Sequence, residues 1–581
     1  KLLPEATSSA TIGVVETLVY RTRAARAAAA EELAEDGRLF RHRLAELGSA
    51  ELPLLARPVR VARRVLELAL GRVRLDVDVA RIATLVNDPP AGEHLLVEPG
   101  TRALVLDAVR RQSDTLSASY VWAPIPWIVG PPGSGRVSLA LAAAHHAGKK
   151  ALIVRTQALP RVPEEIVRAL QAALREALLF DAALVIRDLD VLTGDVERSI
   201  PDLIPHAAAV LANHTGPVII TAVRALWPAG NDRPIVVAEL PVPNEADRIT
   251  LWERTLGPFD AALARDAASR YRITGGVIEK AAASARSHAA GRGTPVELAD
   301  LRAGVRAQLE PDLITLARRI EWQQTWDDLV LPDDVVDELY QMLGRVKHRR
   351  TVLDDWGFGR KVAKGVGISA LFSGAPGTGK TMVAGLIARE LQLDLYQIDV
   401  SRMVSKWVGE TEKNLGRLFD AAAAGHAVLL FDEADSLFAK RTAVTSSNDR
   451  YANLEVNYLL QRMEAFEGIT ILTTNLETSI DEAFRRRLAF RIQFPVPEIE
   501  ERKQLWQAML PAEARIERGI DFTGLAERFA MSGGYIRNAV IRAAYLAADD
   551  GGVITTRHLQ RAAALEYTAM GKIIHGDPTT L

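Results

Sequence analysis

A single run of eight residues restricts the fold of this chain more than any other feature. Gly374-Ala-Pro-Gly-Thr-Gly-Lys-Thr381 fits the pattern G-x-x-x-x-G-K-[ST], in which the glycines allow backbone N–H groups to curl around phosphates. The apolar run Ala370-Leu-Phe predicts a strand before this loop, and Met382 to Leu391 predicts a helix after it. Strand, loop and helix in this order are the context that a phosphate-binding loop requires.

The loop and a second acidic motif together predict a Mg²⁺-dependent ATPase site. Lys380 is expected to reach the β and γ phosphate oxygens, and the Thr381 hydroxyl is expected to ligate Mg²⁺. Val428-Leu-Leu-Phe reads as a strand that ends in Asp432 and Glu433. We expect Asp432 to hold Mg²⁺ through water and Glu433 to polarise the attacking water, although a helix N-cap is the alternative for such a pair. The predicted ATP-binding residues are Gly374, Pro376, Gly377, Thr378, Gly379, Lys380, Thr381, Met382, Asp432 and Arg537.

Further residues are candidates for catalysis or substrate contact. Asn475 ends the predicted strand Ile471-Leu-Thr-Thr and could touch the attacking water, or it could be a simple turn residue. Three adjacent arginines end in Arg486 and Arg487, and their natural target is the γ-phosphate of a neighbouring subunit, where such a residue can raise the rate by roughly 10³ to 10⁵. A solvated basic turn is the alternative.

Two more candidates lie outside the phosphate motifs. Arg537, near a predicted helix start, either reaches back to the phosphates or lies on the surface. Trp407, between Lys406 and Val408-Gly409, either projects into a central pore and grips polypeptide or is buried.

The chain contains one module twice. Gly130-Pro-Pro-Gly-Ser-Gly-Arg136 echoes the loop at Gly374, Pro241-Val-Pro echoes Pro495-Val-Pro, and Thr274-Gly-Gly echoes Ser532-Gly-Gly, at offsets of 244, 254 and 258 residues. In both copies, apolar strand-like runs alternate with helical stretches, which predicts a parallel sheet flanked by helices.

The first copy has lost the residues that carry the chemistry. Arg136 and Val137 replace Lys380 and Thr381, and a guanidinium cannot act as a compact charge between two phosphates. The acidic pair becomes either Arg187-Asp188 or Asp188-Leu189, Ala222 is aligned with Asn475, and Glu279 with Arg537. We therefore expect the first copy to be a structural ring-former, with nucleotide binding without turnover as the alternative.

Composition excludes several classes of protein. The 71 Lys and Arg nearly balance the 73 Asp and Glu, so no global field favours nucleic acid. The chain has no cysteine, which excludes disulfides and thiolate metal sites. No apolar run reaches the roughly 18 residues of a membrane span, and we expect a soluble, cytoplasmic protein without membrane insertion.

The expected fold class is α/β, with tandem P-loop modules, each with a small helical lid, after a mainly helical N-terminal domain. The first hundred residues predict either a winged-helix-like partner-binding domain or a helical cap on the first module. The predicted divisions are an N-terminal domain at 1–104, a degenerate module at 105–243, its lid at 244–310, a linker at 311–347, an active module at 348–497, its lid at 498–572 and a tail at 573–581.

Residues 326 to 570 resemble the AAA branch of the P-loop ATPases. The matching motifs are Trp326-Asp-Asp-Leu-Val, the Gly374 loop, Ser405-Lys-Trp-Val-Gly-Glu, Phe431-Asp-Glu-Ala-Asp, Thr474-Asn and Asp481-Glu-Ala-Phe-Arg-Arg-Arg. The resemblance implies an adenine pocket, a phosphate loop, a pore loop, a Mg²⁺/base pair, a sensor and arginine fingers, usually in a homohexamer. The last motif looks like that of the microtubule-severing type, whose fingers would map to Arg486 and Arg487.

A closer resemblance is to the bacterial AAA ATPases that accompany phage-tail-like extracellular contractile injection systems. It rests on Trp356-Gly-Phe-Gly, Asn448-Asp-Arg-Tyr-Ala-Asn-Leu-Glu, Ser532-Gly-Gly-Tyr-Ile-Arg-Asn and Tyr567-Thr-Ala-Met-Gly-Lys. That group is similar in placing one intact module after a degenerate one, and it implies a role in assembling, remodelling or loading such particles.

The main hypothesis is a hexameric motor, driven by ATP and Mg²⁺, that threads or remodels a protein substrate or an injection-particle component. The first rival is a nucleotide-gated assembly scaffold with little motor activity. A nucleic-acid motor is the second, which the balanced charge and the absence of a recognisable nucleic-acid domain disfavour.

Overall fold

The structure is a computed structural model of the 581-residue chain. It describes residues 10–20, 22–34, 37–41, 43–48, 51–71, 73–114, 123–194, 200–212, 214, 216–225, 233–257, 261–314, 317–349, 351–361, 367–399, 410–425, 427–435, 458–475 and 487–572. The chain divides into two compact units. The first comprises Lys1–Thr255 with Ile273–Glu279, and the second comprises Leu256–Arg272 with Lys280–Leu581.

The first unit begins with a small α/β domain. A three-stranded antiparallel sheet of order β1-β3-β2 adds to the expected helices, and Ile12, Ala29 and Leu33 form the core. The elements up to the first module are β1 (Ala10–Thr11), α1 (Ile12–Val19), α2 (Arg23–Glu32), α3 (Arg38–Arg41), β2 (Ala45–Leu47), β3 (Pro58–Val61), α4 (Arg63–Ala69) and α5 (Val77–Ile82).

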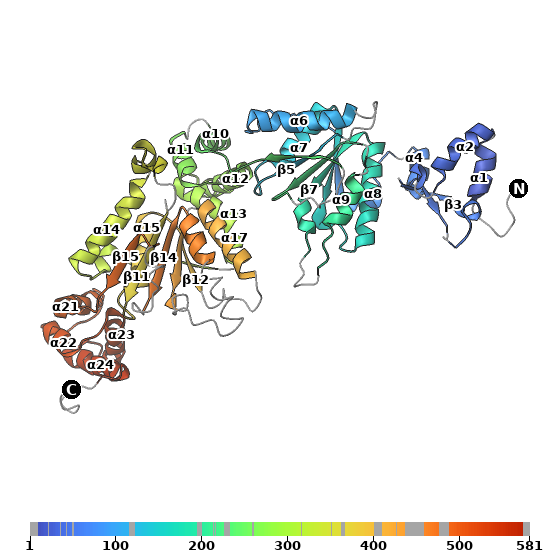
Figure 1. Cartoon of the computed structure of the whole chain (residues 1–581). Helices are drawn as coiled ribbons and strands as arrows, with labels where there is room; N and C mark the ends of the chain where they lie inside the picture. The colour runs from blue at the N-terminus through green and yellow to red at the C-terminus, as the bar shows by residue number, and fades with distance from the viewer. Residues whose placement is uncertain are drawn as a thin grey trace. The chain divides into compact units, whose positions relative to one another are not determined.

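A six-stranded sheet forms the centre of the first module, with helices on both faces (Figure 1). Its order is β4-β6-β7-β8-β5-β9, with only the β4–β6 pair antiparallel. Apolar side chains cover both faces, as the near-continuous hydrophobic strands of a buried parallel sheet require. The elements are β4 (Ala83–Val86), α6 (Pro99–Asp114), β5 (Ile125–Val129), α7 (Arg136–His146), β6 (Lys150–Arg155), α8 (Pro163–Leu179), β7 (Ala182–Arg187), α9 (Ile204–Ala212), β8 (Val218–Ala222) and β9 (Ile235–Glu239).

The second module repeats this sheet strand for strand. Its order is β10-β12-β13-β14-β11-β15, again with one antiparallel edge pair, β10–β12. Its elements are β10 (Arg318–Ile320), α14 (Asp333–Lys347), β11 (Ile368–Gly374), α15 (Lys380–Glu390), β12 (Leu395–Asp399), α17 (Glu410–Gly425), β13 (Val428–Asp432), β14 (Ile469–Thr474) and β15 (Phe490–Phe494). The matching strand orders confirm the predicted α/β fold of two tandem modules.

Helical segments follow both sheets. The first set is α10 (Glu245–Leu256), α11 (Ala261–Arg270), α12 (Gly275–Arg292) and α13 (Leu298–Ile314), and the second is α21 (Ile499–Ala508), α22 (Phe522–Arg528), α23 (Gly533–Asp549) and α24 (Thr556–Ala569). The repeated Leu-Trp pairs place Trp252 and Trp506 in these helices, where both rings are fully buried. Truncating such a ring typically costs about 3–5 kcal/mol, and Trp506 belongs to the core of the second helical set.

Helices α11 and α13 belong to the second compact unit, although they follow the first sheet in the chain. Helix α13 packs against α17, where Leu309 lies close to Gly425. Arg272 and Arg349 both pair with Glu467 in the same unit. The second module is therefore built with helices that precede it in sequence.

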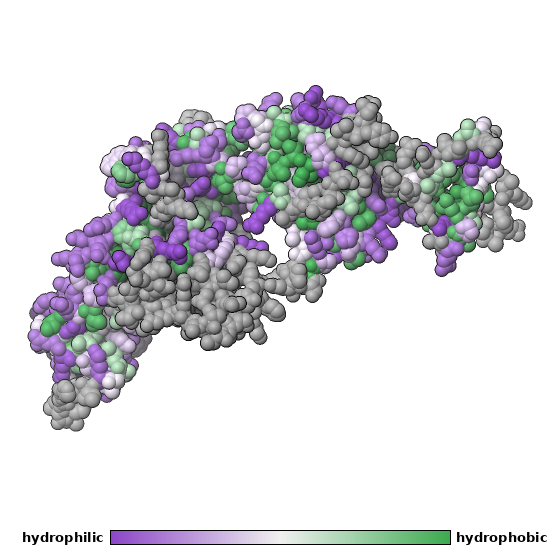
Figure 2. All heavy atoms as spheres, in the orientation of Figure 1, coloured by the Kyte–Doolittle hydropathy of each residue, from purple (hydrophilic) through white to green (hydrophobic). Residues whose placement is uncertain are grey.

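Among the described residues, no helix combines the length and apolar character needed to cross a bilayer. Hydrophilic side chains predominate on the face of the second unit shown in Figure 2.

Candidate active site

The loop from Gly374 to Gly379 joins β11 to α15 and depends on backbone conformations that favour glycine. The φ angles of Gly374, Gly377 and Gly379 are 148°, 76° and 99°. A Cβ added at Gly374 would lie 2.2 Å from the Phe494 carbonyl oxygen, so no larger residue fits there. Lys380 is the first residue of α15. The free N–H groups and positive end of the helix dipole therefore face the loop, which is a favourable place for an anion.

The Lys380 ammonium lies at the centre of this loop. It donates to the carbonyl oxygens of Gly374 at 2.7 Å and Ala375 at 3.0 Å, and to Asn475 Oδ1 at 2.9 Å. The residue is buried, and burial lowers the pKa of Lys380 while the carboxylates of Asp432 and Asp435 act in the opposite direction. The structure thus brings Lys380 and Asn475, which are 95 residues apart, into direct contact.

Thr381 and Asp432 provide hard oxygen donors beside the loop. Thr381 Oγ1 lies 3.4 Å from Asp432 Oδ1, a separation that one small cation can bridge. Gln397 donates to Asp432 Oδ2 at 2.6 Å, and the Thr473 hydroxyl donates to Asp432 Oδ1 at 2.5 Å. The donor set fits Mg²⁺, which prefers few carboxylates and retains several waters.

Glu433 follows β13 in a left-handed conformation with φ of 52°. Its backbone N–H donates to Thr473 Oγ1 at 3.0 Å. A positive φ at a residue with a long side chain costs of the order of 1 kcal/mol or more, and such strain is concentrated at functional sites. Asp432 is the last residue of β13, and the Ala434 N–H after the turn donates to the Thr473 carbonyl oxygen, so the turn stays beside β14.

The second lid is attached directly to the phosphate loop. Ser532 Oγ donates to the Pro376 carbonyl oxygen, and the Gly534 N–H donates to that of Gly377, both at 2.9 Å. Helix α23 begins at Gly533, and Arg537 lies exposed on its first turns. Thr378 and Met382 are on the loop and on α15, with Thr378 Oγ1 donating to the Ala375 carbonyl oxygen at 2.8 Å.

The remaining predicted site residues are Arg486, Arg487 and Trp407. Arg486 and Trp407 lie outside the described residues. Arg487 forms an ion pair with Glu464 at 2.7 Å, and both side chains are about half exposed. The roles of these three residues remain predictions.

Sequence reasoning missed Gln397, Thr473 and Asp435. Gln397 and Thr473 hold the Asp432 carboxylate, whereas Asp435 accepts a hydrogen bond from the Asn475 N–H at 3.0 Å and another from the Thr474 hydroxyl. These residues could have been found from their sequence positions, because they are polar residues near the carboxyl ends of neighbouring parallel strands, where the sites of α/β proteins form.

The first copy retains the backbone of the site. Gly130, Gly133 and Gly135 have φ angles of 156°, 81° and 91°, close to those of the second loop. Its lid is attached by the same two bonds, because Thr274 Oγ1 donates to the Pro132 carbonyl oxygen and the Gly276 N–H to that of Gly133, again at 2.9 Å.

Strand register corrects one alignment made from sequence. Val129 pairs with Ala222, and Ser373 pairs with Thr474, so Ala222 corresponds to Thr474. The counterpart of Asn475 is therefore Val223 rather than Ala222, and the Val223 N–H donates to Asp190 Oδ1 as the Asn475 N–H donates to Asp435 Oδ1. A ladder offset of one residue was not visible in the sequence.

The same register resolves the acidic pair of the first copy as Arg187 and Asp188. Arg136 Nη2 lies 3.0 Å from Asp188 Oδ1, and the Arg136 side chain is 8% exposed. The first site thus contains an internal ion pair, and Val137 has no hydroxyl to ligate a metal. This arrangement lacks the oxygen donors that Thr381 and Asp432 provide.

Comparison with known proteins places a family match over the second sheet. Residues 370–496 match the model of the family "ATPase family associated with various cellular activities (AAA)". The chain is 33% identical over 171 residues to Fidgetin-like protein 1 of Drosophila melanogaster, covering 28% of this chain and 32% of the relative. It is 34% identical over 201 residues to Katanin p60 ATPase-containing subunit A1 of Strongylocentrotus purpuratus, covering 32% and 38%.

A bacterial relative gives a similar result. The chain is 36% identical over 182 residues to an AAA family ATPase, y4kL, of Sinorhizobium fredii, covering 31% of this chain and 52% of the relative. The chain therefore spans between about a third and a half of the length of these curated relatives.

Proposed function

We propose that the second module hydrolyses Mg²⁺-bound ATP and that a ring of identical subunits uses this hydrolysis to remodel a protein. The observation that carries the proposal is the convergence of Lys380, Thr381, Asp432, Glu433 and Asn475 at the carboxyl edge of one parallel sheet. The match of residues 370–496 to an ATPase family supports it.

Each residue has a chemical task in this proposal. Lys380 neutralises the phosphates as they develop charge, and Asn475 holds that ammonium in place. Thr381 and Asp432 hold Mg²⁺, which supplies charge neutralisation and orients the phosphates. Glu433 orients the attacking water and accepts its proton.

Completion of the site requires a second subunit. Arg486 and Arg487 are proposed to reach the γ-phosphate bound by a neighbour, so that a homohexameric ring contains six composite sites. The Arg487–Glu464 pair is exposed and weak, because surface ion pairs contribute about 0–1 kcal/mol, and it can exchange for a phosphate contact.

A protein is the proposed substrate, gripped by Trp407 in a pore, with the first module as a ring-forming tier. A role with contractile injection particles, and a cytoplasmic location, are finer proposals that rest on the sequence resemblance alone. The rival is a nucleotide-gated scaffold. Such a scaffold would hydrolyse ATP slowly, and a partner protein would not stimulate that hydrolysis.

The test is ATP hydrolysis measured against protein concentration. We expect the rate per subunit to rise steeply through the assembly range, and Arg487→Ala to lower the assembled rate by about 10³-fold or more. Arg518→Ala, at an exposed arginine of the second unit, is the matched control and is expected to keep the parent rate. Full activity of a dilute monomer would contradict the composite site.

A further inference from the structure

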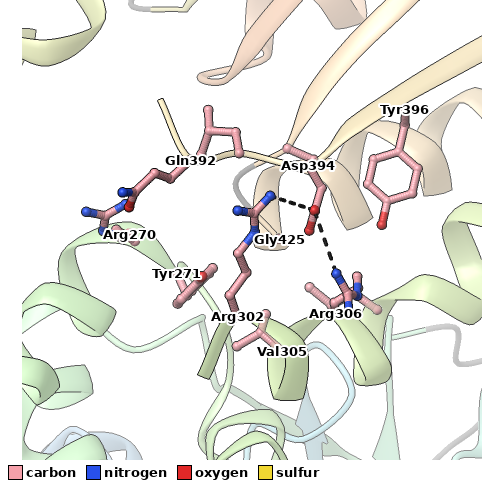
Figure 3. Close-up of a pocket in the computed structure, with 12 residues that line it drawn as sticks. Arg270, Tyr271, Arg302, Val305, Arg306, Gln392, Asp394, Tyr396 and Gly425 are labelled. Carbon is pink, nitrogen blue, oxygen red and sulfur yellow. Dashed lines mark hydrogen bonds and ion pairs between the residues drawn. The ribbon is translucent and has the colours of Figure 1, made fainter. Parts of the chain in front are cut away.

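A cleft of about 790 Å³ lies within the second unit, away from the phosphate loop. One wall comes from α11 and α13, and the other comes from β10, the start of β12 and the end of α15. A narrower pocket, lined by Tyr271, Val305, Leu309, Tyr396 and Gly425 among others, shares several lining residues with the cleft. Figure 3 shows this pocket. The volume is within the range of about 300–1,000 Å³ found for small-molecule sites.

Three guanidinium groups converge on one carboxylate oxygen in this cleft. Asp394 Oδ1 lies 2.7 Å from Arg302 Nη2, 3.9 Å from Arg306 Nη1 and 3.8 Å from Arg319 Nη1. Figure 3 shows Arg302 and Arg306 extending from α13 toward Asp394. A single negative charge cannot balance three positive charges, and like charges this close repel.

Among the described residues that line the cleft, arginines outnumber acids. Arg319 also pairs with Glu321, whose side chain is 75% exposed. The described part of the lining contains five arginines and three acids, namely Arg270, Arg302, Arg306, Arg319, Arg389, Glu297, Glu321 and Asp394. The lining therefore carries a net charge of +2, while the three guanidiniums around Asp394 remain between a quarter and a third exposed.

Neutral hydrogen-bond donors also line the cleft. Trp322, which lines the cleft, has a buried Nε1 atom without a hydrogen-bond partner among the described residues. Its ring packs over Gly385, where an added Cβ would lie 2.5 Å from the ring. Burial raises the pKa of Tyr271 to about 12, so its hydroxyl remains protonated at neutral pH.

One arginine is enough to link α13 to the start of β12 by an ion pair. Arg302, whose Nη2 lies 2.7 Å from Asp394 Oδ1, already forms this link. We propose that the cleft binds a small phosphate-bearing anion through Arg302, Arg306 and Arg319. The guanidinium fork matches phosphate oxygens in a bidentate geometry that a lysine does not offer. Such a ligand would hold α13 to the edge of the second sheet, and the site is independent of the proposed ATPase site.

Equilibrium dialysis of the full chain with ³²P-labelled pyrophosphate tests this proposal. The Lys380→Met variant is used as the background, so that the phosphate loop lacks its ammonium, and EDTA excludes magnesium pyrophosphate. We expect one pyrophosphate to bind per chain under these conditions. The double variant Arg302→Gln/Arg306→Gln should weaken binding by about tenfold or more, because each charge-assisted contact contributes substantially.

The matched control is Arg557→Gln/Arg561→Gln, which removes two exposed arginines with the same four-residue spacing from α24. It should bind pyrophosphate as the parent does. Asp394→Asn removes the competing carboxylate and should tighten binding several-fold, and this variant decides the question if the double variant does not fold. Absence of pyrophosphate binding, equal binding by the double variant and its control, or weaker binding by Asp394→Asn would each overturn the proposal. Binding of a heptaglutamate peptide in place of pyrophosphate would overturn it as well.

Discussion

Asp188 and Glu433 occupy the same place in the two copies of the module. Both have a left-handed backbone, with φ of 58° and 52°, and both donate a backbone N–H to a threonine hydroxyl, at Thr221 and Thr473, at 3.1 and 3.0 Å. Their side chains have different surroundings. Arg136 forms an ion pair with Asp188, whereas the residue that corresponds to Arg136 in the second copy is Lys380. The same turn therefore serves an ion pair in one copy and a proposed catalytic base in the other.

Glu433→Gln should retain ATP binding and lower hydrolysis by at least about 100-fold, since a glutamine cannot accept the proton of the attacking water. Phosphate release under saturating ATP measures the rate, and dialysis with labelled ATP measures binding. Asp188→Asn is the matched change in the first copy and should leave the rate unaltered. A Glu433→Gln protein that turns over at the parent rate would remove this residue from the mechanism.

Lys380→Met should abolish turnover by the whole chain, because we expect no hydrolysis by the first copy, in which Val137 replaces the metal-ligating Thr381. Arg136→Met removes the corresponding side chain and should leave the rate close to that of the parent. The measurement is again phosphate release, made on variants whose folded state has been verified. Residual hydrolysis by Lys380→Met that disappears when Arg136→Met is added would show that the first site is active.

Asn475→Ala should lower the hydrolysis rate by about 10- to 100-fold and change ATP affinity little. The substitution removes the amide oxygen that holds the Lys380 ammonium at 2.9 Å, and a misplaced charge stabilises the transition state less well. Separate determination of kcat and KM distinguishes this from a binding defect. A rise in KM at constant kcat would contradict the positioning role.

Trp407→Ala should spare ATP binding and basal hydrolysis but stop work on a protein substrate. Trp356→Ala is the control, since Trp356 is 68% exposed in the same unit. Unfolding of a fluorescent test protein carrying a terminal recognition segment is a suitable measurement. Equal unfolding by both variants would exclude a gripping role for Trp407.

Asp300→Asn should lower the melting temperature at pH 7 by about 2–4 °C. Arg292 donates to both Asp300 oxygens, at 2.6 and 2.7 Å, and this contact is the main reason that the pKa of Asp300 lies below its ordinary value of 3.8. A carboxylate with a lowered folded-state pKa stabilises the fold above its ordinary pKa and loses that effect as the pH falls. The difference between parent and variant should therefore shrink below pH 3.8, and a constant difference down to pH 2 would refute the assignment.

The central strands were predictable because buried parallel strands are short apolar runs, such as Val428-Leu-Leu-Phe and Ala183-Leu-Val-Ile. The edge strands β4 and β10 were not predictable from the sequence. They contain only four and three residues, form a ladder on one side only, and mix polar and apolar side chains. Loop residues such as Lys380 follow a fixed spacing, whereas Gln397 and Thr473 reach Asp432 only through strand register. The Arg302–Asp394 contact spans 92 residues and has no local signature.

The paired attachment of lid to phosphate loop has a mechanical consequence. In each copy one hydroxyl and one glycine N–H clamp the lid to two consecutive loop carbonyls, so a shift of the loop must turn the lid. The copy with the Arg136–Asp188 ion pair keeps this joint although it lacks the metal-binding oxygens. An assembly of such chains would contain two lid–loop attachments per subunit but only one proposed hydrolytic site. The lid of the first copy would therefore move only in response to changes elsewhere in the assembly.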